Sequence, residues 1–229
     1  MAANYGGIPV TCYRCSAWPC VCHDGITIIH GDCREVLPLL ATDSIDLVLT
    51  DPPYGVEFEY GGDYRDTWDE WVDLIDVALP SMRKVGRAVM LSTSKIEGER
   101  HIWLHHSPDW RMCWYKGALS TRSAIGFKDW ETVFVWGRSW QIPMHDFFHI
   151  PPEEFGAFGH PCPKPIRWAK HLISKGTDNV DSTILDPFMG SGTTLRAAKD
   201  LGRKAIGIEI EERYVQIACD RLRQEVLAL

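Results

Sequence analysis

The sequence lacks a long apolar run. Nowhere among its 229 residues are there the roughly eighteen consecutive apolar residues that a membrane-spanning helix requires. Residues 1–11 also lack the basic and apolar regions of a secretory signal, and internal repeats and low-complexity tracts are absent. We therefore expect a protein of the cytoplasm that has no membrane partner.

The sequence has no excess of positive charge either, since its formal net charge is −7. This argues against binding of nucleic acid through bulk electrostatics alone, because such domains usually carry a basic face. The charge is uneven, with a net −8 for residues 1–100, +3 for residues 101–175 and −2 for residues 176–229. If nucleic acid binds, its phosphates are expected at the middle stretch, which also holds seven of the nine histidines. The alternative is an ordinary solvated surface.

Cysteines are not scarce, but disulfides are not expected in a reducing compartment. Four of the eight cysteines crowd the start of the chain, at Cys12, Cys15, Cys20 and Cys22. A C-x-x-C pair followed by a C-x-C pair can supply four thiolates to a tetrahedral zinc ion, although typical zinc ribbons separate their pairs further. We therefore expect a Cys-rich segment at residues 1–25 with a candidate structural zinc site. The alternative is a reduced leader without metal.

The remaining stretch, residues 26–229, suits one α/β domain. Short β-branched and apolar runs predict strands at residues 26–30, 45–49, 87–92, 112–115, 132–136, 182–185 and 205–210. Helical spacing of apolar residues predicts helices at 34–41 (shortened by Pro38), 67–79, 94–105, 166–174, 192–201 and 211–227. Capping boxes at Thr67 with Glu70 and at Ser94 with Glu97 support two of these helix starts. Strands that alternate with helices indicate a mostly parallel sheet covered on both faces.

One predicted strand, residues 45–49, leads into Thr50-Asp51-Pro52-Pro53-Tyr54-Gly55. Neither proline has an N–H group for a sheet ladder or a helix, so the chain leaves the sheet here as a stiff tip. The tip presents the carboxylate of Asp51, backbone carbonyls and the ring of Tyr54. These groups suit a flat molecule with an exocyclic amine, because two acceptors meet its two N–H bonds and a ring stacks on its face. The tip predicts a site for a nucleobase amine; the alternative is an ordinary turn with a surface tyrosine.

A second motif, residues 186–194, also follows a predicted strand and opens a predicted helix. Gly190 and Gly192 let the backbone approach a ligand closely, beside the N–H groups of a helix start. Glu209 ends the next strand, where comparable folds place an acid on ribose hydroxyls. A nicotinamide dinucleotide fits part of this pattern, but its third fingerprint glycine is missing, and Asp186 suits an ammonium better than a pyrophosphate. A ligand with an ammonium, a ribose and an adenine is S-adenosylmethionine.

Together these residues resemble the amino-group DNA methyltransferases. The motif order, with Asp51-Pro52-Pro53-Tyr54 before the glycine turn, resembles the circularly permuted beta type of that family. The resemblance runs from Ile26 over nearly the whole chain and implies a Rossmann-like methyltransferase fold with a mostly parallel, seven-stranded sheet. His160-Pro161-Cys162-Pro163-Lys164-Pro165 resembles the family segment that precedes the cofactor loop, usually His-Pro-Thr-Gln/Glu-Lys-Pro, and departs from it at Cys162 and Pro163.

The resemblance implies roles for individual residues. The implied catalytic set is Asp51, Pro52, Pro53 and Tyr54. The implied set for binding of S-adenosylmethionine is Asp32, Lys164, Asp186, Phe188, Gly190, Ser191, Gly192, Thr193, Thr194 and Glu209. Asp51 and the Pro52 carbonyl would accept the two N–H bonds of the amine and aim its lone pair at the sulfonium methyl, while Tyr54 stacks on the flipped-out base. This interpretation requires that the two strand ends share one cleft.

Several alternatives remain. An Asp at the first motif position resembles the adenine-N6 enzymes more than the cytosine-N4 enzymes, so adenine N6 is predicted and cytosine N4 is the alternative. Carbon-5 cytosine methyltransferases use a Cys after Pro, but neither Pro19-Cys20 nor Pro161-Cys162 follows a strand in the required place. Methylation of a protein glutamine uses a similar tip with Asn in place of Asp. An inactive, zinc-bearing DNA-binding protein is the alternative from another class.

The resemblance implies double-stranded DNA as the partner, in a bacterium or a phage-infected cell, with or without a restriction enzyme. Two stretches without periodic pattern, residues 55–66 and 137–163, remain as target-recognition loops. The first is expected to be a mobile loop beside the tip. Their small size predicts a short target site and favours a homodimer that shares the work of recognition.

Overall fold

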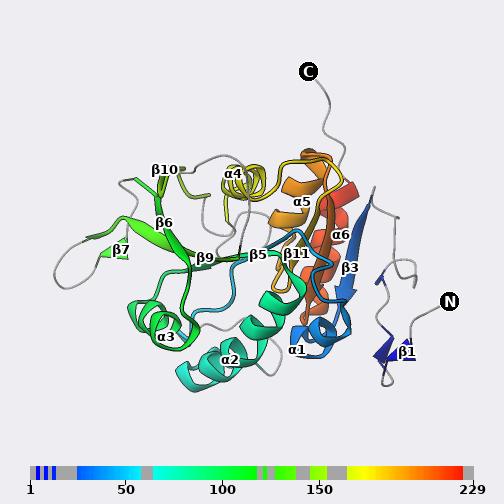
Figure 1. Ribbon diagram of the computed structural model, residues 1–229, viewed down its shortest axis with the longest axis horizontal. Coiled ribbons are helices and arrows are strands. Elements are labelled where there is room, and N and C mark those ends of the chain that lie inside the picture. The colour runs from blue at the N-terminus through cyan, green and yellow to red at the C-terminus, as the bar shows by residue number, and fades with distance from the viewer. Residues whose placement is uncertain are drawn as a thin grey trace.

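The computed structural model describes residues 4–5, 8–9, 12–13, 25–57, 64–117, 121–122, 127–137, 145–153 and 164–223. Its centre is a sheet of eight described strands in the order β10-β6-β9-β5-β4-β11-β12-β3 (Figure 1). Strand β9 runs antiparallel to both of its neighbours, and the other adjacent pairs are parallel. The predicted mostly parallel α/β sheet is confirmed, with one strand more than expected.

The strands of this sheet are β3 (Ile26–His30), β4 (Leu47–Thr50), β5 (Ala88–Thr93), β6 (Trp110–Tyr115), β9 (Trp130–Gly137), β10 (Phe147–His149), β11 (Thr183–Asp186) and β12 (Lys204–Glu209). The helices are α1 (Cys33–Val36), the 3-10 helix η1 (Leu37–Leu39), α2 (Trp68–Val85), α3 (Ile96–His106), α4 (Ile166–Gly176), α5 (Thr193–Asp200) and α6 (Glu212–Arg223). Two small hairpins lie outside the main sheet: β1 (Asn4–Tyr5) with β2 (Ile8–Pro9), and β7 (Thr121–Arg122) with β8 (Phe127–Lys128). Among the described helices, none is both long and apolar enough to cross a membrane.

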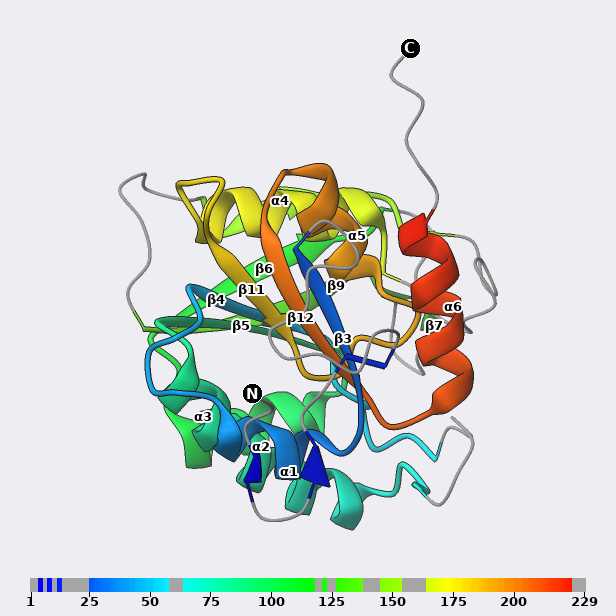
Figure 2. The ribbon, with the colours of Figure 1, turned by 90° about the vertical axis from the view of Figure 1, so that its right-hand side faces the viewer.

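Helices cover both faces of the sheet (Figure 2). On one face, α1, α2 and α3 pack through residues such as Trp71, Leu79 and Ile102 against the strands. On the other face, α4, α5 and α6 contribute residues such as Leu172 and Leu195 to a second apolar cluster. The sheet is therefore buried on both sides, and its strand ends are the places where polar side chains can gather.

Helix α2 shows how the sequence sets one of these elements. The Thr67 hydroxyl accepts a hydrogen bond of 3.3 Å from the Glu70 N–H, which confirms half of the predicted capping box. The Glu70 carboxylate instead accepts a hydrogen bond of 3.0 Å from the Arg65 N–H. The helix was expected to end before Pro80, but it continues to Val85. Met82 and Val85 are buried and prolong its apolar stripe. Their burial offsets the cost of about 3 kcal/mol that a proline imposes inside a helix.

Two further predictions need correction. The capping box at Ser94 and Glu97 is wrong, because α3 begins at Ile96 with Lys95 as its N-cap and has no side-chain cap hydrogen bond. The stretch 137–163 was expected to be irregular, yet it contains β10, which pairs in parallel with β6 at the sheet edge. Phe148, the middle residue of β10, is buried. A strand this short has too few positions to show an alternating pattern in the sequence.

Candidate functional site

The two motifs lie at the carboxyl ends of neighbouring strands. β4 and β11 pair in parallel, with Val48 opposite Leu185. Beyond this pair, the Thr50 hydroxyl donates a hydrogen bond of 2.7 Å to Asp186 Oδ1, which joins the last residues of the two strands. Both motifs line one cleft, as the sequence interpretation requires.

Most of the residues implied by the resemblance meet in this cleft. Those that line it are Asp32, Asp51, Pro52, Pro53, Tyr54, Lys164, Asp186, Phe188, Gly190, Ser191, Thr193, Thr194 and Glu209. Gly192 is not among its lining residues; it is the N-cap of α5. The cleft therefore brings together carboxylates, hydroxyls and an aromatic ring from the ends of three neighbouring strands, β4, β11 and β12.

Asp51 is held by two side chains. The Tyr54 hydroxyl donates a hydrogen bond to Asp51 Oδ1, and Lys164 Nζ lies 3.1 Å from Asp51 Oδ2. Lys164 also donates a hydrogen bond of 2.6 Å to the Tyr54 hydroxyl. Burial raises the pKa of Asp51, and the attraction of Lys164 opposes this rise in part. The described contacts thus place Lys164 at the base-amine motif, whereas the resemblance assigned it to the cofactor.

Lys164 belongs to a chain of alternating charges. Its Nζ lies 3.0 Å from Glu131 Oε2, and Lys116 Nζ lies 3.0 Å from Glu131 Oε1. Glu131 is buried on β9, and burial alone would raise its pKa, but the two lysines outweigh burial and lower it. Burial would lower the pKa of Lys164, but the attraction of Asp51 and Glu131 outweighs burial and raises it. Lys164 is therefore a permanently charged cation beside the tip.

Backbone contacts hold the tip in place. Trp71 Nε1 donates a hydrogen bond of 2.6 Å to the Pro53 carbonyl. The buried Asp66 accepts hydrogen bonds from the N–H groups of Gly55 (2.7 Å) and Val56 (3.1 Å). Lys95 donates to the Gly55 carbonyl. The described ends of the 55–66 stretch are anchored, while residues 58–63 lie outside the described residues, so the mobile loop there stays a prediction.

On the other side of the cleft, Asp186 is held by uncharged groups. Its Oδ1 accepts hydrogen bonds from the Thr50 hydroxyl and from the Phe188 N–H, the latter at 3.1 Å. Burial raises the pKa of Asp186 to about 6, and the hydrogen bonds from hydroxyl and N–H groups oppose this rise. No described cation offsets this burial, and a ligand with a positive charge would do so.

Glu209 closes the glycine turn. Its Oε2 accepts a hydrogen bond of 2.9 Å from the Gly190 N–H, and its Oε1 accepts one of 2.8 Å from the Glu211 N–H. Burial raises its pKa to about 7. Its backbone carbonyl accepts from the Gly31 N–H at 2.9 Å, which draws the end of β3 to the same place. Glu209 thus lies at the end of β12 with each carboxylate oxygen on a backbone N–H.

The turn itself requires glycine. Gly190 and Gly192 have φ angles of 49° and 79°, in the left-handed region. A Cβ at Gly192 would also lie 3.0 Å from the Ala218 Cβ of α6. From α6, the buried Arg221 donates hydrogen bonds to the Thr193 hydroxyl at 3.0 Å and to the Ser191 carbonyl at 3.4 Å. The conformation of the turn is therefore set by its own glycines and by Arg221.

Asp32 is placed at a fourth strand end, after β3. It is the N-cap of α1 and accepts a hydrogen bond of 2.8 Å from the Arg34 N–H. The Arg34 guanidinium also pairs with its carboxylate. Burial would raise the pKa of Asp32, but the hydrogen bonds from Arg34 outweigh burial and lower it. Asp32 is thus an ionised acceptor at the rim of the cleft.

Some predictions fall outside the described residues. These are Cys15, Cys20, Cys22, and the stretches 58–63, 138–144 and 154–163, the last of which includes Cys162 and Pro163. Cys12 is described and buried, and the neighbouring Tyr13 N–H donates a hydrogen bond of 2.9 Å to the Ile28 carbonyl. The zinc site at the four cysteines therefore stays a prediction.

Sequence reasoning missed Glu131, Lys116 and Arg221. Glu131 lies in a run of strand formers, and Arg221 lies on the amphipathic pattern of a helix, so neither stands out locally. A buried charge can be recognised only once its partners are known. Trp71 was identified as an apolar position of α2, but its bond to the Pro53 carbonyl was not foreseen.

Residues 92–220 match the family model of DNA methylases of the N6/N4 type. The chain is 30% identical over 211 residues to the putative methylase YubD of Escherichia coli K12, with 85% of this chain and 88% of YubD covered. Among solved structures, the cytosine-N4-specific PvuII DNA methyltransferase superposes with a TM-score of 0.70 at 19% identity, covering 89% of this chain and 88% of that one. A putative DNA modification methylase from Thermus thermophilus, complexed with S-adenosylmethionine, superposes with a TM-score of 0.65 at 22% identity, covering 88% and 95%. These two structures show the methyltransferase fold.

Proposed function

This chain belongs to the DNA methylase family of the N6/N4 type, and from that premise we propose that it methylates the exocyclic amine of adenine in duplex DNA, with S-adenosylmethionine as the methyl donor. The observation that supports the proposal most is the single cleft in which the Asp51-to-Tyr54 tip faces the glycine turn. Thr50 and Asp186 join the two strand ends, so the distance between them is fixed by the sheet.

The donor set on the β11 and β12 side fits S-adenosylmethionine. Asp186 is a buried carboxylate without a described cation beside it, which suits an ammonium. Glu209 places its carboxylate where ribose hydroxyls bind in comparable folds. Gly190 has no side chain, so a ligand can approach the backbone of the turn closely. When bound, the cofactor supplies a sulfonium methyl group. Asp186 and Glu209 would orient it.

The tip would hold the base. Asp51 Oδ and the Pro52 carbonyl accept the two N–H bonds of the amine, which withdraws its lone pair from the ring and aims it at the methyl group. The negative charge of Asp51 then faces the positive charge that develops on nitrogen. Orientation and electrostatics suffice for direct transfer, and no covalent intermediate with the protein is required. A base within a duplex cannot reach the tip, so it must be flipped out and stacked on Tyr54.

For the base to bind, Asp51 must change partners. Its carboxylate is engaged by the Tyr54 hydroxyl and by Lys164. Lys164 keeps a second carboxylate partner in Glu131, so it can withdraw from Asp51 without losing all charge compensation. We infer that Lys164 and Glu131 hold the tip closed until the amine arrives.

Adenine is proposed because an Asp at the first tip position resembles adenine enzymes. Cytosine N4 is the second candidate, and the fold similarity to the PvuII enzyme, which is cytosine-N4-specific, favours it. Both amines need the same two acceptors, so the tip alone does not separate them. Discrimination between adenine and cytosine must therefore come from the shape of the base pocket.

Modified-base analysis tests this proposal. DNA from bacterial cells that express the chain, digested to nucleosides and examined by mass spectrometry, should contain additional N6-methyladenine. Expression of Asp51→Ala at the same level is the control and should give none. N4-methylcytosine in place of N6-methyladenine would support the second candidate. A purified, folded protein that binds S-adenosylmethionine but modifies neither base would contradict both.

The predicted homodimer is also a proposal. It rests on the small size of the stretches left for target recognition. Light scattering of the purified chain, alone and with a short duplex that contains its target, should give a mass of two chains on DNA. A mass of one chain per duplex at saturating protein would contradict it.

A further inference from the structure

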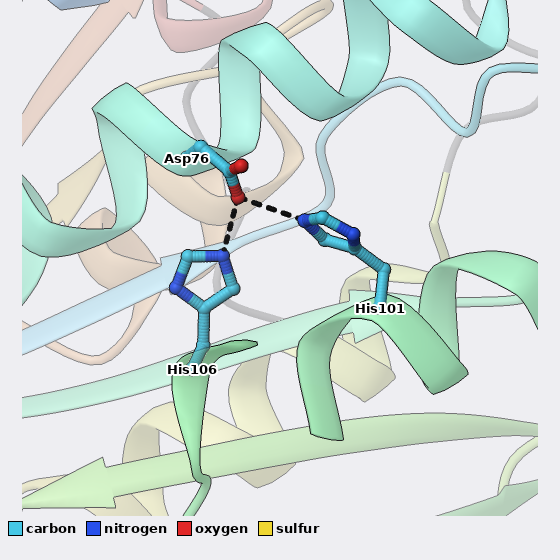
Figure 3. Close-up of side chains that lie close together, drawn as sticks. All are labelled: Asp76, His101 and His106. Carbon is cyan, nitrogen blue, oxygen red and sulfur yellow. Dashed lines mark hydrogen bonds and ion pairs between the residues drawn. The ribbon is translucent and has the colours of Figure 1, made fainter. Parts of the chain in front are cut away.

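A cluster of one carboxylate and two imidazoles lies away from the cleft, between α2 and α3. Asp76 comes from α2, His101 from the second turn of α3, and His106 from its last residue (Figure 3). Both His Nε2 atoms point at the same oxygen, Asp76 Oδ1, at 2.8 Å from His101 and 2.7 Å from His106. One potential ligand atom from each residue lies within 4.8 Å of the other two.

We propose that Asp76, His101 and His106 bind a divalent transition-metal ion that links α2 to α3. Two imidazoles and one carboxylate are a donor set suited to zinc and its first-row neighbours. The cluster lies on the face covered by α1, α2 and α3 and shares no residue with the cleft, so the proposal does not depend on the proposed activity.

The two imidazoles are held in position by their surroundings. The His101 ring meets Trp68 and Trp71 edge-on, with centroids 6.1 and 5.7 Å apart. The backbone carbonyl of His106 accepts a hydrogen bond of 2.8 Å from Trp136 Nε1. Only 12% and 8% of the His101 and His106 side chains are exposed. Ligands that are already ordered lose little conformational entropy when a metal binds.

The carboxylate can make the small movement that a metal requires. Ligand atoms around tetrahedral zinc are about 3.3 Å apart, given Zn–N and Zn–O bonds of about 2.0 Å. The present O–N distances of 2.8 and 2.7 Å must therefore open slightly. Asp76 is 45% exposed, so its side chain can shift toward solvent, and the same exposure gives an ion a path to the site.

A fourth donor is close by. The exposed His105 has its ring centroid 4.5 Å from that of His101, one helical turn away on α3. Histidines four residues apart lie on the same helix face and can ligate one ion together. Either His105 or water would complete a tetrahedron.

A ring nitrogen binds a metal ion through its lone pair, and both Nε2 atoms already lie beside the Asp76 carboxylate. The same contacts without an ion would be two ordinary hydrogen bonds on one carboxylate, and the experiment must separate these two states.

Cobalt(II) titration of the tag-free full chain, after removal of metals by a chelator, separates a metal-binding cluster from one that is only hydrogen-bonded. We expect one cobalt ion per cluster, with weak visible d–d absorption and no thiolate charge-transfer band from this site. Asp76→Asn keeps the size of the side chain, and His101→Gln keeps a polar group in its place. Each should weaken cobalt binding by about tenfold or more, because each removes one ligand. The control His145→Gln changes an exposed histidine elsewhere and should leave binding unchanged.

Zinc is the second probe. At a concentration well above its dissociation constant, it should raise the melting temperature of the wild-type chain and of His145→Gln but not of Asp76→Asn. Failure of the wild-type chain to bind cobalt or zinc in the micromolar range would overturn the proposal. Cobalt bound only through thiolates, with absorption unchanged by both cluster substitutions, would overturn it as well, since the ion would then lie at the N-terminal cysteines.

Discussion

The two sides of the cleft hold their carboxylates in different ways. On the cofactor side, Asp186 and Glu209 accept hydrogen bonds from hydroxyl and backbone N–H groups. On the base side, Asp51 is paired with a buried cation, Lys164, which is itself paired with Glu131. Backbone donors are fixed by the fold, whereas a lysine on a flexible stem can move.

This difference indicates that the cofactor side keeps its contacts, whereas the base side changes them during binding. The cofactor side is shaped by the backbone, because Gly190 adopts a left-handed conformation and its N–H is held by Glu209. On the base side, Asp51 is paired with Tyr54 and Lys164, and it must exchange these partners for the amine when a base binds. Four predictions test this comparison.

The largest effect is expected for Asp51→Ala. Removing the acceptor and its negative charge should lower single-turnover methyl transfer by about 10³-fold or more. Cofactor affinity should change by about threefold at most, because Asp51 lies on the other side of the cleft. Tritiated-methyl transfer and calorimetric binding of S-adenosylmethionine measure the two quantities. Asp73→Ala, an exposed change on α2, is the control; an active Asp51→Ala protein would contradict the assigned role.

Lys164→Met should lower methyl transfer by about 10²-fold near neutral pH. Without the lysine, the pKa of Asp51 and that of Glu131 rise, because each loses an opposite charge. The carboxylate that accepts the amine is the ionised form, so activity should recover as pH rises and the acidic limb of the pH profile should move upward.

Two comparisons sharpen this test. Lys164→Arg keeps the charge and should restore the wild-type position of the acidic limb. Lys84→Met removes an exposed lysine and should change nothing. If the profile of Lys164→Met kept its wild-type shape, with only its height reduced, the lysine would have no electrostatic role at Asp51.

Glu209 should make stability depend on pH. Its pKa is about 7 in the folded chain, above the ordinary value of 4.5, so the folded state binds the additional proton between these values. The unfolding free energy of the wild-type chain, measured against Glu209→Gln, should therefore be highest below pH 4.5 and fall as pH rises through 7. We expect a fall of about 3 kcal/mol.

Urea denaturation of both proteins at a series of pH values measures this difference. Glu35→Gln, which removes an exposed carboxylate, is the control. The prediction would be contradicted if the unfolding free energy of the wild-type chain, relative to that of Glu209→Gln, increased with pH. Such an increase would show that a cation of the protein compensates the charge of Glu209.

Thr50→Val should have the smallest effect, about 1 kcal/mol of unfolding free energy, because it removes one buried hydrogen bond to Asp186 without creating a cavity. Thr93→Val is a matched control on the neighbouring strand β5, since the buried Thr93 hydroxyl has no hydrogen-bond partner among the described residues. That substitution should be neutral or stabilising. Equal effects of the two would indicate that the bond between the strand ends contributes nothing.

What the sequence predicted depends on the range over which each feature acts. The Asp51-to-Tyr54 tip and the Gly190 turn are local, because proline and glycine restrict or free the backbone where they stand. Their meeting in one cleft followed from the rule that parallel strands end at the same edge of the sheet. Strand β10 was missed because only its pairing with β6 defines it.

The charged partners of the site residues could not be predicted from the sequence for the same reason. Glu131 contacts Lys164 across 33 positions, and Arg221 contacts Thr193 across 28. In the sequence, each looks like an ordinary residue of a strand or a helix. The cluster of Asp76 with His101 and His106 likewise exists only because α2 and α3 pack side by side.

The most direct test of the shared cleft is a structure of the chain with an unreactive analogue of S-adenosylmethionine and a duplex that contains its target. We expect a flipped base whose amine donates to Asp51, with its nitrogen about 3–3.5 Å from the position of the transferable methyl group. Lys164 should then have moved from Asp51 while it remains with Glu131. A bound base that leaves Asp51 paired with Lys164 and Tyr54, or a cofactor that lies outside the cleft between the two strand ends, would contradict the proposed mechanism.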